Sequence, residues 1–139
     1  YEIMANAADF TLPPEKMLPI FIGSVFDAFL KNQELMRIVM WMILEADSID
    51  FARTHGGFQT VIEFGKPYLQ QHIESGNIKN IDIDIVLMTI RAIFVFMLSE
   101  NHSHIQSFGK DFSDSEHAAR VKKSILQSIM SMLGLKLQE

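Results

Sequence analysis

The chain contains no cysteine among its 139 residues, which excludes disulfides, cysteine-based zinc sites and thiol catalysis. Glycine and proline are also scarce, with seven and four copies, whereas methionine (9) and phenylalanine (11) are abundant. This balance disfavours a turn-rich β fold and favours helices around a bulky interior. With 48% hydrophobic and 21% charged residues, the chain has enough apolar side chains to bury the core of one domain.

Long blocks of like charge and long apolar runs are missing too. The formal net charge is -5, and the longest run of like charge is the Lys122–Lys123 pair, so this segment lacks the basic stripe that nucleic-acid binding needs. The longest apolar stretch, residues 85–98, is interrupted by Thr89 and Arg91. It is shorter than the roughly 20 residues that cross a bilayer. We therefore expect no membrane association and a cytoplasmic location.

Apolar residues recur every three or four positions in five segments, each of which we predict to be a helix. The predicted helices cover residues 15–30, 33–47, 58–75, 83–101 and 114–133. Pro13 and Pro14 suit the start of the first of them, and Asp82 or Asp84 would cap the fourth. The fifth begins at Ser113-Asp114-Ser115-Glu116, which has the form of a capping box. The expected fold is an all-α bundle of five to six helices.

The last two predicted helices differ from ordinary amphipathic helices. Apolar residues face nearly every direction on the segment 83–101, which predicts a central helix surrounded by neighbours. The segment 114–133 has two apolar faces. One face can serve the core of the chain, and we expect the second to meet a partner.

Motifs that carry catalysis are not found. The sequence has no glycine-rich phosphate loop, no nucleophile elbow and no His-Glu-x-x-His pattern, so we predict no catalytic residues and no enzyme. The best metal candidate joins His102 and His104 with Asp111 and His117, but a solvated polar loop explains these residues better than a site with four ligands does. We expect no metal and no cofactor.

Two polar residues lie close to apolar stripes. Arg91 falls midway along the most apolar segment, where an unpaired charge would be costly. It could pair with a carboxylate such as Glu45 or Glu63, or its guanidinium could meet a ligand in a cavity. His72 could bind a ligand or act as the polar partner of a helix C-terminus.

The order of these parts resembles the C-terminal ligand-binding and dimerisation domain of TetR-family transcriptional regulators. Residues 29–38 (FLKNQELMRI) are similar to the helix end, turn and next helix of that domain. Residues 69–78 (LQQHIESGNI) resemble its helix–Gly–turn before the long dimer helix. The resemblance implies that residues 1–139 form one effector-binding and dimerisation domain. The N-terminal helix-turn-helix domain of the family would be missing, and DNA would be contacted only through it.

The resemblance also implies a ligand-responsive regulator, a repressor, that forms a homodimer through a four-helix bundle of the last two helices. Its effector would be a mainly apolar small molecule, because the candidate walls offer few polar groups. The predicted ligand-binding residues are Phe21, Val25, Trp41, Phe58, Ile62, Met88, Arg91 and Phe94. The predicted dimer-interface residues are Ala92, Phe96, Val121, Ile125, Ser128 and Met132. The alternative is a stand-alone helical domain that binds a small molecule, a lipid or another protein.

Overall fold

The computed structural model describes residues 9–34, 37–38, 57–99, 105–107 and 109–137, excluding the side chains of 57–62 and 95–99. Most of this part of the chain is helical, and no strand occurs in it. The long helices are α2 (Pro14–Lys31), α5 (Gly57–Glu74), α6 (Ile83–Ser99) and α8 (Ser115–Met132). The predicted all-α class is therefore confirmed, and four predicted helices agree closely with these bounds. The predicted helix 33–47 falls mainly outside the described residues.

Local sequence signals explain where these helices begin and end. Pro14 opens α2, where its missing N–H costs no hydrogen bond. Asp82, rather than Asp84, caps α6, because its Oδ1 accepts hydrogen bonds from the amides of Asp84 (3.0 Å) and Ile85 (3.3 Å). After α5 the chain turns through Gly76, whose φ of 76° lies in the left-handed region that glycine adopts without strain.

The predicted cap of α8 is wrong by one residue. The N-cap is Asp114, whose Oδ1 accepts the amide of His117 at 2.9 Å. The Ser113 hydroxyl donates instead to Asp111 Oδ1, which also accepts the Ser113 amide at 2.9 Å. The side chain of Ser113 is thus held in the preceding turn and is not available to the first turn of the helix.

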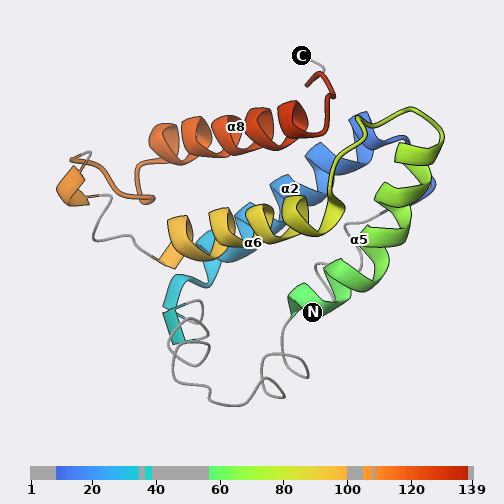
Figure 1. The fold of residues 1–139 in the computed structure, drawn as a ribbon. Helices are drawn as coiled ribbons and strands as arrows, with labels where there is room; N and C mark the ends of the chain where they lie inside the picture. The colour runs from blue at the N-terminus through green and yellow to red at the C-terminus, as the bar shows by residue number, and fades with distance from the viewer. Residues whose placement is uncertain (1–8, 35–36, 39–56, 100–104, 108, 138–139) are drawn as a thin grey trace.

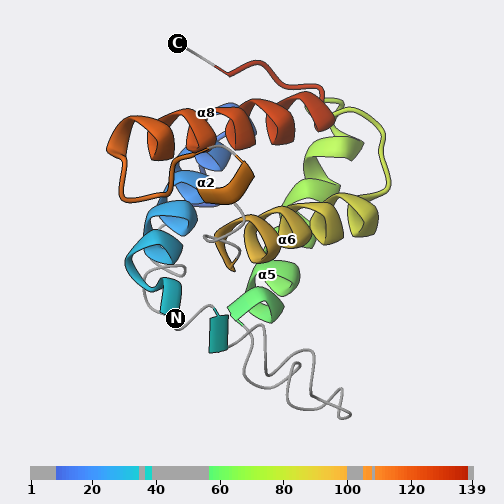
Figure 2. The same cartoon turned by 90° about the vertical axis from the view of Figure 1, so that its left-hand side faces the viewer.

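Helix α6 is the central element of the described chain, but it is not surrounded on all sides as predicted, since Ile85 and Met88 are more than half exposed. It contacts α2, α5 and α8, and α8 also packs along α2 (Figure 1). Seen after a 90° turn, α8 crosses above α2 and α6 (Figure 2). The connection between α5 and α6 is joined to the end of α8 by a hydrogen bond from the Lys79 amide to the Leu133 carbonyl at 3.0 Å.

Most apolar side chains of α8 pack against the core of the chain itself. Ile129 and Met130 are almost completely enclosed, and Ile125 is 4% exposed. Val121, Leu126 and Met132 pack against the same core. Val121, Leu126 and Met132 are only half-buried in the single chain, so the expectation that a second apolar face of this helix meets a partner stays a prediction. The outer surface of α8 is mainly polar, and its exposed residues are Ser115, Glu116, Ala119, Arg120, Lys123, Ser124, Gln127, Ser128 and Ser131.

Across the described residues, no helix combines the length and the apolar character that crossing a membrane would require.

Candidate functional site

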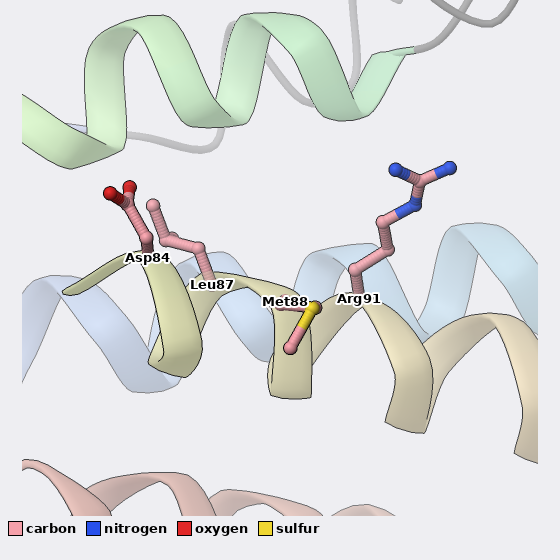
Figure 3. A pocket seen from close by; sticks show the side chains of 4 residues that line it. All are labelled: Asp84, Leu87, Met88 and Arg91. Atoms are coloured by element: carbon pink, nitrogen blue, oxygen red, sulfur yellow. The ribbon is translucent and has the colours of Figure 1, made fainter. Parts of the chain in front are cut away.

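A hollow of about 120 Å³ lies along α6 and is lined by Asp84, Leu87, Met88 and Arg91. We call it the α6 groove. These residues share one face of the helix because they are spaced by three, four and seven positions. Asp84, Leu87 and Arg91 extend toward α5, while Met88 lies along the side of α6 (Figure 3). The groove therefore opens on the side of α6 that meets α5.

The two ends of the groove carry opposite charges. At one end, Lys66 Nζ on α5 lies 2.6 Å from Asp84 Oδ1. Both side chains are about half exposed or more, so this ion pair contributes little stability, but it joins α5 to α6 and offsets the charge of Asp84. The half-buried Arg91 follows seven residues later, roughly 10 Å farther along the helix axis.

Apolar groups form the middle of the groove. Leu87 is 9% exposed and supplies a fixed wall, whereas Met88 is 60% exposed and has the flexible side chain that adapts to a guest. A volume of about 120 Å³ is close to the ~150 Å³ of a cavity that holds benzene. It is well below the roughly 300 Å³ at which drug-sized pockets begin. The groove suits a single ring or a short chain.

The structure brings together two of the predicted ligand-binding residues, Met88 and Arg91. Val25 and Phe94 are instead buried in the core, where the Phe94 ring stacks on Phe29 with centroids 5.8 Å apart. Phe21 is partly buried against the same core. These three side chains pack in the core of the described part of the chain, and their role in ligand binding stays a prediction. The remaining candidates lie outside it, namely residue Trp41 and the side chains of Phe58 and Ile62.

Asp84 and Leu87 were not predicted as site residues. A signal for them is present in the sequence, since they precede Arg91 by seven and four positions and so share its helix face. From the sequence alone, Asp84 is expected only as a possible helix cap. In the structure Asp82 caps the helix, whereas Asp84 lines the α6 groove and pairs with Lys66.

The predicted dimer residues fall into two groups. Ala92 on α6 and Ser128 on α8 are exposed, and the Ser128 hydroxyl donates to the Ser124 carbonyl at 2.9 Å. Val121 and Met132 are half-buried against the core, and Ile125 lies within it. The side chain of Phe96 is outside the described residues. Two other apolar residues of α6 are also exposed, Ile85 (53%) and Met88 (60%).

The two histidines within the described residues, His72 and His117, pack against aromatic rings. His117 is buried at the start of α8, with its ring stacked on Phe112 at a centroid distance of 5.9 Å. His72 packs its ring against Tyr68 at 4.6 Å, and its Nδ1 lies 3.1 Å from Asn77 Nδ2. These contacts agree with the interpretation of His72 as a polar group at a helix end. His102 and His104 lie outside the described residues, and no group of three or more potential metal ligands occurs within them.

The family relationship follows from a comparison of the sequence with known proteins. A family model described as "Tetracyclin repressor-like, C-terminal domain" matches residues 14–129, from the first residue of α2 to near the end of α8. No curated protein and no solved structure matches the chain. Because the match includes all of α2, α5 and α6 and most of α8, the chain belongs to the family of tetracyclin repressor-like C-terminal domains.

Proposed function

We propose that this chain is the effector-binding and dimerisation domain of a ligand-responsive transcriptional repressor, with the effector bound in the α6 groove. The position of the groove carries this proposal. It lies on α6, which contacts each of the other three long helices of the described chain. A ligand held there can favour one packing of the domain over another, provided that its affinity for the two packings differs.

The groove also fits a controlled switch better than a permanent binding site. One wall is joined to the neighbouring helix by the exposed Lys66–Asp84 ion pair, which is weak enough to break at small cost. The other wall, Leu87, belongs to the core. A ligand that displaces α5 from α6 therefore also changes the contacts of α6 with α2 and α8.

Dimerisation is proposed through α6 and α8, with Ala92, Phe96, Val121, Ile125, Ser128 and Met132 as the contact set. Among these, the exposed Ala92 and Ser128 are the positions to test. Replacement of Ile125 by Glu would place a charge in the core and unfold the chain, so it could not distinguish a dimer contact from a folding defect.

The experiment is sedimentation velocity on the wild type, the Ala92→Glu and Ser128→Glu variants, and a control variant, Gln70→Glu. Gln70 is an exposed residue of α5, so this control adds the same charge outside the proposed interface. We expect a dimer for the wild type and the control and a weaker dimer for the two test variants, with the helical circular dichroism unchanged. A monomeric wild type, or test variants that dimerise as tightly as the control, would contradict the interface.

Coupling between ligand and dimer separates the regulator from the alternative of a stand-alone binding domain. A regulator requires that a groove ligand change the dimer dissociation constant, and linkage then requires that dimerisation change the ligand affinity by the same factor. The measurement is dimer dissociation in the presence of toluene, benzoate and benzylamine. Ligand binding without a change in dimerisation would favour the stand-alone domain.

A further inference from the structure

We infer that an exposed apolar stripe of α6 packs against the same stripe of a second copy of the chain, with the two helices antiparallel and Met88 beside the two-fold axis. This α6 stripe consists of Ile85, Met88 and Ala92. The inference rests on the proposed dimer and goes beyond it, because it assigns the central contact, its register and the relative direction of the two helices.

The α6 stripe is an apolar surface that the single chain leaves uncovered. Ile85 is 53% and Met88 60% exposed, and Ala92 is exposed as well. Spacings of three and four residues place the three side chains on one face of the helix. Thr89 borders the stripe, but its hydroxyl already donates to the Ile85 carbonyl at 2.8 Å. Contact with another apolar surface would therefore remove these side chains from water without breaking a hydrogen bond of Thr89.

The sizes of the side chains favour a second copy as the partner. A two-fold interface requires a surface that is complementary to itself. In the α6 stripe a large residue, Ile85, and a small one, Ala92, lie at opposite ends, with Met88 between them. Antiparallel helices would place each Ile85 opposite the partner subunit's Ala92, and the flexible Met88 would fill the centre. Parallel helices would instead crowd two isoleucines at one end and leave a gap between two alanines at the other.

The distribution of charge also favours this face. The formal net charge of -5 makes two copies repel each other, so a stable contact has to avoid like charges. The α6 stripe contains no charged residue. Asp84 and Arg91 extend from α6 toward α5 (Figure 3), where Lys66 Nζ lies 2.6 Å from Asp84 Oδ1. The outer surface of α8 exposes Arg120 and Lys123, so a two-fold contact centred there would bring cations together.

The inferred register connects the dimer contact to the α6 groove. Met88 belongs to both, since it lines the groove and lies in the middle of the α6 stripe. A second copy on the stripe would border the groove beside Met88. A groove ligand and the partner would then contact the same side chain, which gives ligand binding a direct route to the dimer.

The experiment uses the absence of cysteine from the chain. Ile85→Cys, Met88→Cys and Ala92→Cys each introduce one thiol, and oxidation with copper phenanthroline forms a disulfide where two Cα atoms come within about 4.4–6.8 Å. Met88→Cys should form a disulfide with its own copy. Ile85→Cys and Ala92→Cys alone should not, since each position would lie roughly 10 Å along the helix from its own copy. An equal mixture of these two variants should form disulfides efficiently.

Charged replacements at Met88 test the same contact without a disulfide. A residue beside the two-fold axis faces its own copy, so Met88→Glu alone and Met88→Lys alone should each weaken the dimer at least about ten-fold. An equal mixture of the two should dimerise more tightly than either variant. Met88 is 60% exposed, so the helical circular dichroism should not change. Gln70 is exposed on α5 outside the stripe, and the matched controls are Gln70→Cys and Gln70→Glu.

The possible outcomes separate this inference from the proposed function. If Ile85→Cys and Ala92→Cys each form disulfides with themselves and their mixture does no better, the helices are parallel and the inferred register is wrong. If the wild type is a dimer but Met88→Cys and Met88→Glu behave like the Gln70 controls, the proposed dimer stands and the α6 stripe is not its centre. If sedimentation velocity shows a monomeric wild type, both the inference and the proposed dimer fail.

Discussion

Lys122 on α8 places its Nζ 2.8 Å from each carboxylate oxygen of Asp27 on α2. Its side chain reaches Asp27 by passing over Gly23, one turn earlier on α2. A Cβ at position 23 would lie 3.2 Å from Lys122 Cε, which is tighter than an ordinary contact. A glycine thus allows a charged side chain to cross the interface between two packed helices.

The Asp27–Lys122 ion pair should contribute measurably but modestly to stability. Asp27→Asn is expected to lower the free energy of unfolding by up to about 1 kcal/mol, because both side chains are partly exposed and screened by solvent. Urea unfolding of Asp27→Asn, Lys122→Met and the double variant gives the coupling energy. The coupling should shrink in high salt. Purely additive effects in low salt would show that the pair is energetically irrelevant.

Substitutions at Gly23 should separate helix propensity from packing. Gly23→Ala should raise the free energy of unfolding by up to about 1 kcal/mol, because alanine is the better helix former and the end of the Lys122 side chain can shift by a few tenths of an ångström. Gly23→Leu should lower it by about 1–3 kcal/mol through overpacking. In a Lys122→Ala background the cost of Gly23→Leu should fall. An unchanged cost would mean that Lys122 is not the obstacle.

We expect the free energy of unfolding to fall in strongly alkaline solution because Tyr68 ionises there. Its hydroxyl donates to the Leu12 carbonyl at 2.8 Å. Burial, assisted by the charge of Glu15, raises the pKa of Tyr68 from 10.0 to about 12. Since the folded-state pKa is the higher one, this contribution is complete below pH 10 and is lost as the pH rises toward 12.

The test is a phenolate absorbance titration of the wild type and of Tyr68→Phe. The chain has only two tyrosines, so Tyr68→Phe should remove the late-titrating phase and leave Tyr1. The variant should also lose about 1 kcal/mol of stability at neutral pH with the hydrogen bond to Leu12. A late phase that persists in Tyr68→Phe would contradict the assignment.

The cap of α8 should be sensitive to acid. The His117 amide and the Lys110 side chain hold the pKa of Asp114 below its ordinary value of 3.8. A lowered folded-state pKa means that the stabilisation is present above pH 3.8 and is lost as the pH falls through the folded-state value.

Two variants separate the contribution of the hydrogen bond at the cap from the contribution of the charge. Asp114→Asn keeps an acceptor for the His117 amide but removes the charge, whereas Asp114→Ala removes both. At neutral pH, urea midpoints should decrease from wild type to Asn to Ala. The difference between wild type and Asn should vanish in acid. A difference that is independent of pH would rule out the charge of Asp114 as its source.

Local sequence signals predicted the helices but not what each helix face contacts. Periodicity and end signals predicted α2, α5, α6 and α8 because caps and apolar spacing act within a few residues. Whether the apolar faces of α8 meet a partner or the core depends on where α2 and α6 lie. Ile125 shows this, since its spacing predicts a dimer contact and yet it is only 4% exposed within the single chain.

The candidate site was predicted only in part, because its lining depends on how the helices are arranged. Arg91 stood out because a charge interrupts an apolar stretch, and Met88 because methionines suit adaptable walls. Val25 and Phe94 lie in the core and not at the α6 groove, and the sequence does not show this because a core side chain and a pocket side chain have the same apolar pattern. Only the position of α5 relative to α6 shows which face of α6 remains accessible.

The hydrogen bond from Lys79 to Leu133 has a mechanical consequence for the helix pair α5 and α6. It joins their connecting segment to the end of α8, so we expect this connection to move less than the far end of the pair when a ligand separates the two helices. Displacement then grows with distance from this connection. Arg91 lies two turns farther from it than Asp84, so a ligand at the arginine end of the groove has the longer lever arm for moving α5.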